Sequence, residues 1–178
     1  MVIMNLRFDN YSIRDLSPND VEALVKYANN YSVSRFLRDV FPYPYKIEDA
    51  EKWVNFVMND KNNFAYAIAD ESELIGVIGA NLNSDVNRFT LEIGYWIGEP
   101  FWNKGITTKA VKLYCNFLFT NYNFNHLTAS IFEGNEASAK VVQKAGFVLE
   151  GVLRKNVFKE NRFLDQYIYG ILKEEFKL

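Results

Sequence analysis

Apolar side chains recur at helical spacing between residues 105 and 121. They fall on one face of a predicted helix, at Ile106, Ala110, Val111, Tyr114, Cys115, Leu118 and Phe119. The preceding residues, 89–97, are rich in aromatic and β-branched side chains and form a run too short for a stable helix, so they predict a strand. This part of the chain therefore predicts a strand, a tight turn and an amphipathic helix.

The same patterns predict the remaining elements. Helices are expected at residues 18–28, 47–58 and 136–144, and strands at residues 11–16, 64–69, 74–82, 127–132, 147–156 and 162–171. The strand at 11–16 reads as an edge strand, and residues 1–10 carry few signals beyond a frayed start or a short strand. Residues 31–45 hold aromatic and proline residues that favour neither a helix nor a central strand. These elements predict an α+β (mixed α/β) fold, with a mainly antiparallel sheet of six to seven strands and helices on both faces.

The junction between the central strand and its helix has the features of an anion site. Backbone N–H groups at a helix start lack intrahelical partners, and the helix dipole adds partial positive charge there. Gly105 allows a ligand to approach the backbone, Lys104 adds a positive charge, and Thr107 and Thr108 add hydroxyl donors. The P-loop and the G-x-G-x-x-G motif are both absent, which argues against nucleotide binding through them. The alternative is that proline, asparagine and glycine simply form a turn here.

Four short motifs then occur in a recognisable order. They are Glu92-Ile93-Gly94-Tyr95-Trp96-Ile97, Trp102-Asn103-Lys104-Gly105-Ile106, Asn135-Glu136-Ala137-Ser138, and Gly146-Phe147 followed by Glu150-Gly151. In this order and spacing the chain resembles the GNAT superfamily of N-acetyltransferases, and most of all its ribosomal-protein N-terminal acetyltransferase (RimJ/RimL-type) branch. The resemblance extends over residues 74–176 and implies a GNAT-like sheet with splayed central strands.

The resemblance implies acetyl-CoA as co-substrate. Its diphosphate would bind the amides around Trp102 to Thr107, and its pantetheine arm would follow the strand that ends in Tyr95, Trp96 and Ile97. The full set of coenzyme-binding residues implied is Tyr95, Trp96, Ile97, Trp102, Asn103, Lys104, Gly105, Ile106, Thr107, Thr108 and Asn135.

One position departs from the family pattern. The phosphate turn usually has glycine where this chain has Asn103. Asparagine tolerates left-handed backbone angles better than other non-glycine residues, so the turn is expected to survive. Its side chain adds bulk near the diphosphate. We expect acetyl-CoA binding to be retained, and the sequence does not tell whether it is weakened.

The resemblance also implies catalytic roles. Acetyl transfer to an amine needs a base for the amine and a proton donor for the departing thiolate. Several relatives use an acid on the central strand as the base, often through water, and Glu92 lies on that strand; its alternative role is an outward-facing charge. A base that some branch members carry in the strand after Gly-Phe is replaced by the apolar Val157. Glu150 is expected to be structural.

The proton donor is assigned by a similar comparison. Many GNAT enzymes place a tyrosine four residues before the Gly-Phe pair, where this chain has Val142. In the RimJ/RimL-type pattern the donor is the serine that matches Ser138. Asn135 would bind the pantetheine amide, or cap the following helix, or do both.

The acceptor is an amine of open identity. Branch resemblance favours the N-terminal α-amine of a protein or peptide, and a small amine such as a polyamine or aminoglycoside is the alternative. In the family layout, residues 36–45 and 159–165 would flank the acetyl group, so Asp39 and Asp165 are either partners for a cationic amine or solvated or structural charges. A further alternative is that the protein is not an enzyme but a regulatory module that binds acyl-CoA without catalysis.

Length and composition limit the domain organisation, the partners and the location that can be expected for the chain. A chain of 178 residues fits a single domain, 1–178. Its formal charge of −2 lacks the excess of positive charge that is typical of proteins that bind nucleic acid. Only one cysteine is present, Cys115, so an intramolecular disulfide is impossible, and its place on the apolar helix face argues for direct transfer in a ternary complex without an acetyl-enzyme. His126 is the only histidine, so no metal site is expected. No leader or membrane run is visible, and we expect a cytoplasmic monomer or homodimer that binds no membrane.

Overall fold

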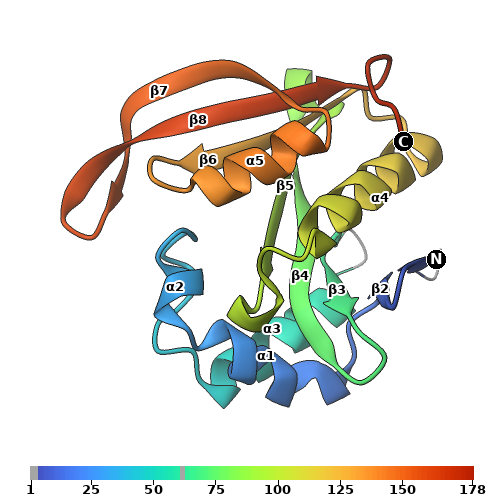
Figure 1. The fold of residues 1–178 in the computed structure, drawn as a ribbon, viewed down its shortest axis with the longest axis vertical. Coiled ribbons are helices and arrows are strands. Elements are labelled where there is room, and N and C mark those ends of the chain that lie inside the picture. Colours follow the sequence, from blue (N-terminus) through green and yellow to red (C-terminus); the bar gives the residue numbers. More distant parts are fainter. Residues whose placement is uncertain (1–3, 61–62) are drawn as a thin grey trace. The chain divides into compact units, whose positions relative to one another are not determined.

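The computed structural model describes residues 4–60 and 63–178 (Figure 1). Residues 1–3 of the predicted frayed start lie outside the described part. The chain divides into two compact units, the first made of Met1–Gly79 and Tyr95–Ala110 and the second of Ala80–Gly94 and Val111–Leu178. The expectation of a single domain stays a prediction, and the two units are described in turn.

The described residues form eight strands, five α-helices and three short 3-10 helices. The strands are β1 (Asn5–Phe8), β2 (Tyr11–Arg14), β3 (Tyr66–Ala69), β4 (Leu74–Leu82), β5 (Thr90–Ile97), β6 (His126–Phe132), β7 (Val148–Lys159) and β8 (Arg162–Leu172). The helices are α1 (Val21–Ala28), α2 (Tyr31–Ser34), α3 (Ile47–Asn59), α4 (Ile106–Asn121) and α5 (Glu136–Lys144). The 3-10 helices are η1 (Pro18–Asp20), η2 (Asp85–Asn87) and η3 (Glu99–Phe101).

The strands follow the order β1-β2-β3-β4-β5-β6-β8-β7. β5 pairs with β6 in parallel, and the pairs β1/β2, β2/β3, β3/β4, β6/β8 and β7/β8 are antiparallel. A parallel pair needs a long crossover, which the segment containing α4 provides. The mixed, mainly antiparallel fold class is confirmed, but the sheet has eight strands rather than six to seven. β1 is the additional strand, and it takes the edge position predicted for β2.

The first unit has its core between two helices and two strands. α1 and α3 pack against each other (Figure 1). Their apolar faces share one cluster with the strands, made of Leu16, Ala23, Leu24, Ala28, Tyr45, Ala50, Val54, Val57, Ala67, Leu74 and Val77. Residues 31–45 were predicted as loop throughout, but their first four residues form α2. This single helical turn is capped by Asn30, whose side chain accepts a hydrogen bond from the Ser32 N–H.

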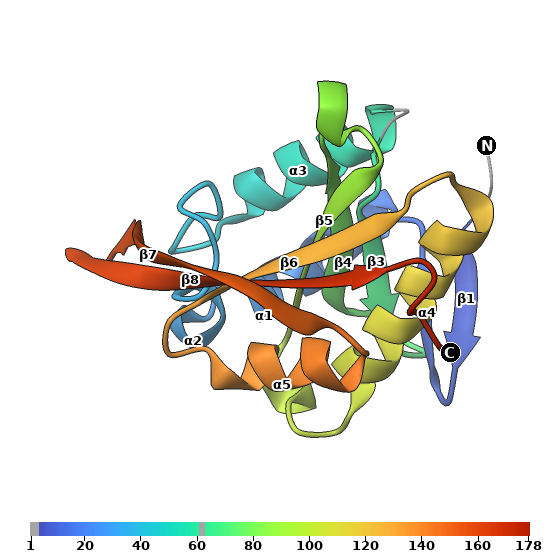
Figure 2. The same cartoon turned by 90° about the horizontal axis from the view of Figure 1, so that it is seen from above.

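The second unit is built on β6, β8 and β7, with β8 in the middle (Figure 2). Alternate residues of β6 are buried, as a strand with one face on a core requires. β7 continues to Lys159, past the predicted end at residue 156, and a two-residue turn then leads into β8. Both turn residues, Glu160 and Asn161, have positive φ, which matches the turn type that suits the twist of a hairpin.

Candidate active site

The turn between β5 and α4 is held by main-chain and indole hydrogen bonds. The Gly98 N–H donates to the Ile75 carbonyl at 2.8 Å, which ties the end of β5 to β4. The Trp102 indole N–H donates to the Ile97 carbonyl, also at 2.8 Å, and closes the turn on itself. Residues 102–105 are all exposed to solvent. We call residues 97–108 the anion turn.

Two residues of the anion turn have left-handed backbone angles. Asn103 has a φ of 59° and Gly105 a φ of 75°. The expectation that asparagine can replace glycine in this turn is therefore confirmed at the level of backbone conformation. Apart from its two chain neighbours, no described residue has an atom within 4 Å of a Cβ built on Gly105, so the space beside this residue is open. The main chain at Gly105 is accessible to a ligand.

The amides that follow are those of a helix start. The Lys109 N–H donates to the Gly105 carbonyl at 3.2 Å, which is the first intrahelical bond of α4. The N–H groups of residues 106–108 precede that bond and carry the positive end of the helix dipole. Ile106 is buried and anchors the helix start, whereas Thr107 and Thr108 are half-buried. Lys109 is ion-paired with Asp9 at 2.6 Å, so Lys104 is the lysine that adds charge to the exposed turn.

Helix α1 packs against the anion turn through Tyr27. The Tyr27 ring lies against the main chain of Gly98, where a Cβ atom would come within 2.6 Å of Tyr27 Cδ1. The same ring meets Phe101 edge-on, with 5.4 Å between ring centroids. The Tyr27 hydroxyl donates to Glu73 Oε1 at 2.7 Å, and the Lys26 ammonium donates to the same oxygen at 2.6 Å. These two donors, Lys26 foremost, hold the pKa of Glu73 below its usual value, so Glu73 accepts both bonds as a carboxylate.

In the second unit, Asn135 caps α5. Its Oδ1 atom accepts a hydrogen bond from the Ser138 N–H at 3.2 Å, so the capping role considered for it is present. Ser138 itself is half-buried in the first turn of the helix. Val142, at the position where many relatives have tyrosine, is fully buried and belongs to the core.

The other carboxylates considered differ in their surroundings. Glu92 is half-buried on β5, and no hydrogen bond to its carboxylate is found among the residues that the structure describes. Glu150 has a structural position, because its Oε1 lies 3.0 Å from His126 Nε2 and its carboxylate covers Gly170. Residues 95–108 of the predicted set all belong to the first unit, whereas Glu92, Asn135 and Ser138 belong to the second.

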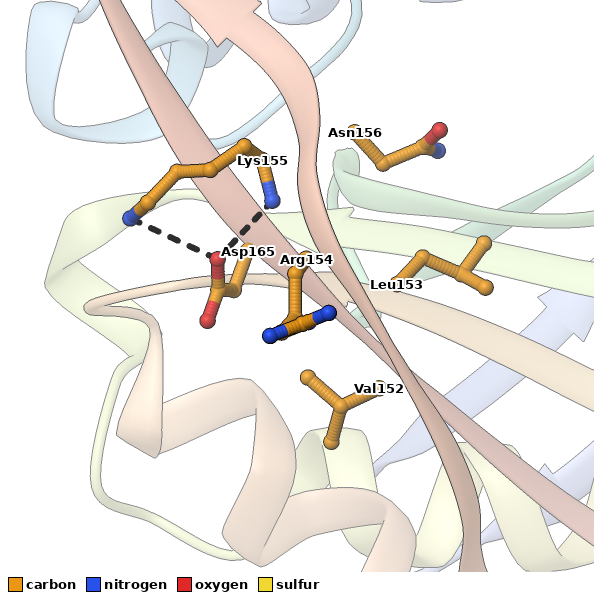
Figure 3. Close-up of a pocket in the computed structure, with 6 residues that line it drawn as sticks. All are labelled: Val152, Leu153, Arg154, Lys155, Asn156 and Asp165. Carbon is orange, nitrogen blue, oxygen red and sulfur yellow. Dashed lines mark hydrogen bonds and ion pairs between the residues drawn. The ribbon is translucent and has the colours of Figure 1, made fainter.

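A hollow of about 620 Å³ lies at an irregularity in the β7–β8 hairpin (Figure 3). The register shifts between Leu153 and Val157, and the intervening residues Arg154, Lys155 and Asn156 line the hollow with Asp165. Asp165 Oδ1 accepts a hydrogen bond from the Lys155 N–H at 2.9 Å and lies 3.4 Å from the Lys155 ammonium.

These contacts define what Asp165 does in the hairpin. The backbone N–H of Lys155 is the largest contribution that lowers the pKa of Asp165, and the charges of Lys155 and Arg154 add to it. Glu133 Oε2 in turn accepts a hydrogen bond from the Asp165 N–H at 2.9 Å. Asp165 therefore holds the irregular hairpin together, as the structural reading of this charge expected. The basic side chains of Arg154 and Lys155 line the hollow beside it.

Comparison with known proteins places the chain in a family. The acetyltransferase (GNAT) domain model matches residues 11–148. The chain belongs to the GNAT acetyltransferase family. This GNAT chain is 30% identical over 165 residues to the uncharacterized N-acetyltransferase YnaD of Bacillus subtilis (strain 168), covering 92% of the chain and 94% of YnaD. It is 31% identical over 126 residues to the ribosomal-protein-serine acetyltransferase of Escherichia coli (strain K12), covering 69% and 70%.

A solved structure shares the fold of this GNAT enzyme. RimL, a ribosomal alpha-N-protein acetyltransferase in complex with coenzyme A, superposes with a TM-score of 0.84 and 21% identity, covering 94% of this chain and 97% of RimL. The predicted GNAT family is confirmed, and the chain is an acetyltransferase. Its relatives include a ribosomal-protein acetyltransferase, as the predicted resemblance to that branch requires.

The described residues contain neither a cluster of metal-ligating side chains nor a helix that could span a membrane. No group of three or more histidine, cysteine, aspartate or glutamate side chains able to hold a metal ion occurs in residues 4–60 and 63–178. In the same part of the chain, no helix has both the length and the apolar character needed to cross a membrane.

Sequence reasoning did not find the residues that support the anion turn. Tyr27 and Asn30 lie about 70 positions before the turn they contact, and no local pattern connects such distant residues. The pair Asn29-Asn30 directly after α1 is a turn and capping signal. That signal indicates the helix end, but not that the Asn30 amide bonds to Glu99.

Proposed function

We propose that this GNAT enzyme transfers the acetyl group of acetyl-CoA to a primary amine, with the N-terminus of a protein or peptide as the acceptor. The observation that carries the proposal is the anion turn. It presents exposed left-handed residues, an open face at Gly105 and the first amides of a 16-residue helix in one continuous segment. Such a segment suits the diphosphate of a coenzyme.

The remaining coenzyme contacts are proposed from the family resemblance. Residues 102–108 would hold the diphosphate through main-chain N–H groups and Lys104, and the strand residues Tyr95, Trp96 and Ile97 would hold the pantetheine arm. Asn135 would bind the pantetheine amide through atoms that its cap bond leaves available, since an amide side chain has both donors and an acceptor. The coenzyme A bound to RimL supports this proposal.

The transfer needs two proton movements, and we assign one residue to each. Bound acetyl-CoA supplies the acetyl group as a thioester, so the amine nitrogen forms a bond to the carbonyl carbon and the carbon–sulfur bond breaks. Glu92 accepts the proton that the amine loses, directly or through water, and its carboxylate, half-buried and without a hydrogen-bond partner in residues 4–60 and 63–178, suits this role. Ser138 donates a proton to the departing thiolate.

Replacing Ser138 with alanine should lower turnover by at least about tenfold, because general acid catalysis contributes factors of this size or more. Coenzyme affinity should change little, since the Asn135 cap bond uses the Ser138 main-chain N–H and survives the replacement. Steady-state rates and calorimetric binding of coenzyme A would be compared for the two proteins. Unchanged turnover would remove Ser138 from the mechanism.

Cys115 should not react with thiol reagents in the folded protein. The side chain is fully buried, and burial raises the pKa of its thiol far above the usual value, so the nucleophilic thiolate is scarcely formed. Labelling with iodoacetamide, read by mass spectrometry, should occur only after unfolding in urea. Stoichiometric labelling of the native protein, or acetyl found on Cys115 during turnover, would contradict direct transfer.

Protein acceptors are favoured over small cations by two observations. The relatives include a ribosomal-protein-serine acetyltransferase and RimL. In addition, the hollow on the β7–β8 hairpin is lined by Arg154 and Lys155, while Asp165 is already engaged by Lys155. A polyamine carries several positive charges and would be repelled by the Arg154 guanidinium, whereas the charge of Lys155 is offset by its ion pairs with Asp165 and Glu133.

Amine-dependent release of coenzyme A tests the function. The purified protein and acetyl-CoA would be mixed with peptides of varied N-terminal residue, a polyamine and an aminoglycoside, and free thiol would be measured. We expect release with at least one peptide and little with the polyamine. Tight acetyl-CoA binding without release for any amine would contradict the enzyme and leave an acyl-CoA-binding module.

A further inference from the structure

Residues 31–45 form a closed loop in the first unit, which we call the aromatic loop. The loop leaves α1 at Asn29 and Asn30 and ends at the buried Tyr45. The Tyr45 N–H donates to Asn29 Oδ1 at 3.1 Å, so a single hydrogen bond brings the two ends of the loop together. Such a loop is compact, and its position depends on what holds its ends and its rings.

Asn30 connects the start of the aromatic loop to the anion turn. Its Oδ1 atom accepts the Ser32 N–H at 2.8 Å and caps α2, while its Nδ2 atom donates to Glu99 Oε2 at 2.6 Å. Glu99 is the first residue of η3, within the anion turn. One amide group thus fixes the helix start with its oxygen and reaches the turn with its nitrogen. The bond to Glu99 is charge-assisted, which makes it stronger than a neutral hydrogen bond.

A second contact connects the middle of the aromatic loop to the strand that enters the turn. The Phe41 ring meets Trp96 edge-on, with 5.8 Å between centroids and an interplanar angle of 70°. Phe41 also packs on Tyr45, at 5.0 Å between centroids, so the ring contact and the closed loop end belong to one aromatic group. Trp96 immediately precedes Ile97, the residue whose carbonyl accepts the Trp102 indole bond.

We propose that Asn30 is a positioning residue that couples the anion turn to the aromatic loop. The inference rests on the proposed function, because it takes coenzyme A as the ligand of the turn. A ligand that immobilises the turn also immobilises the Glu99 carboxylate, and through Asn30 it fixes the start of α2. The aromatic loop is then ordered in the coenzyme complex and looser without it. By reciprocity, an ordered loop raises the affinity of the turn for coenzyme.

Hydrogen–deuterium exchange with and without coenzyme A tests this coupling. The informative amides are those of Ser34, Arg35 and Tyr45, whose hydrogen-bond partners lie at the start of the loop or directly before it. In the unmodified protein, saturating coenzyme A should slow their exchange by at least about fivefold, the lower end of typical coupling between sites. A calorimetric titration of the same sample establishes that the coenzyme is bound.

A donor–acceptor swap isolates the bond between Asn30 and Glu99. Asn30→Asp keeps the cap, because aspartate accepts the Ser32 N–H equally well, but it sets two carboxylates against each other. The slowing should then disappear and coenzyme affinity should fall about fivefold. Adding Glu99→Gln lets the new amide donate to the carboxylate introduced at position 30, and both effects should be restored. Glu99→Ala, which removes the acceptor and leaves Asn30 in place, should also abolish the slowing.

The outcomes separate the inference from the function. Coenzyme binding without slowed exchange in the unmodified protein would overturn the coupling and leave the proposed function standing. Slowing that persists in Asn30→Asp and Glu99→Ala, or a swap that fails to restore it, would overturn the role of Asn30. Absence of coenzyme binding in the unmodified protein would overturn the proposed function, and the coupling with it.

Discussion

Replacing Gly105 with valine should weaken acetyl-CoA binding at least about tenfold while leaving the protein folded. Gly105 has a φ of 75°, which costs an L-residue about 1–2 kcal/mol and a β-branched residue more. The turn would relax away from this conformation and withdraw its amides from the ligand. Apart from the two chain neighbours, no described residue has an atom within 4 Å of the added Cβ, so the side chain would also occupy the open space that the ligand needs. Calorimetric titration with acetyl-CoA measures the change.

Two matched replacements control this experiment. Gly151→Val also adds a Cβ into open space, but on a strand and without a left-handed backbone, so its acetyl-CoA affinity should equal that of the unmodified protein. Asn103→Gly relieves the left-handed strain at φ 59° and should retain or modestly increase the affinity. Equal affinity for the Gly105 and Gly151 variants would show that the anion turn does not contact the coenzyme.

Replacing Gly76 with alanine should lower the free energy of unfolding by about 3 kcal/mol, the upper range for overpacking a core. The added Cβ would collide with the Trp96 carbonyl oxygen and come within 2.9 Å of Ile97 Cα. Both are main-chain atoms of β5 and cannot rotate out of the way. The strand must move, and the hydrogen bond between Gly98 and Ile75 moves with it. Urea denaturation followed by circular dichroism measures the loss.

Gly170→Ala is the matched control for Gly76. Its Cβ would collide with the Glu150 carboxyl group, the far end of a flexible side chain. Glu150 can turn away at the expense of its contact with His126, so we expect a loss below about 1 kcal/mol, the range for a solvent-exposed polar side-chain contact. Urea midpoints that fall equally in the two variants would contradict the distinction between main-chain and side-chain collisions.

Local patterning predicted most of the elements because their apolar faces repeat with clear periods. α4 and β4 lie where their spacing indicated, and the strand at 90–97 differs from its prediction by one residue. Residues 1–10 left a frayed start and a short strand open, and β1 is that short strand; four residues carry too little periodicity to decide between the two from the sequence. α2 was missed because it is a single turn that depends on the Asn30 cap, within a segment whose aromatic and proline content favours a loop. A helix in such a segment can be predicted from the sequence only when it is long enough to show a clear apolar period.

The candidate site was predictable where its chemistry is local and not where it depends on the fold. The left-handed turn at Asn103 and Gly105 could be inferred from residue types at a strand–helix junction. The packing of Tyr27 on Gly98 and the bond between Asn30 and Glu99 join residues about 70 positions apart. The type of a residue does not indicate which distant residue it will contact in the fold. Asp165 could equally have been a substrate partner, and only its contacts with Lys155 identify it as structural.

Isothermal titration calorimetry of the purified protein with acetyl-CoA tests the central claim, that the anion turn binds the coenzyme diphosphate. We expect saturable binding of one coenzyme per chain, with affinity that Gly105→Val reduces and Gly151→Val does not. Heats no greater than those of dilution at millimolar acetyl-CoA would contradict the account.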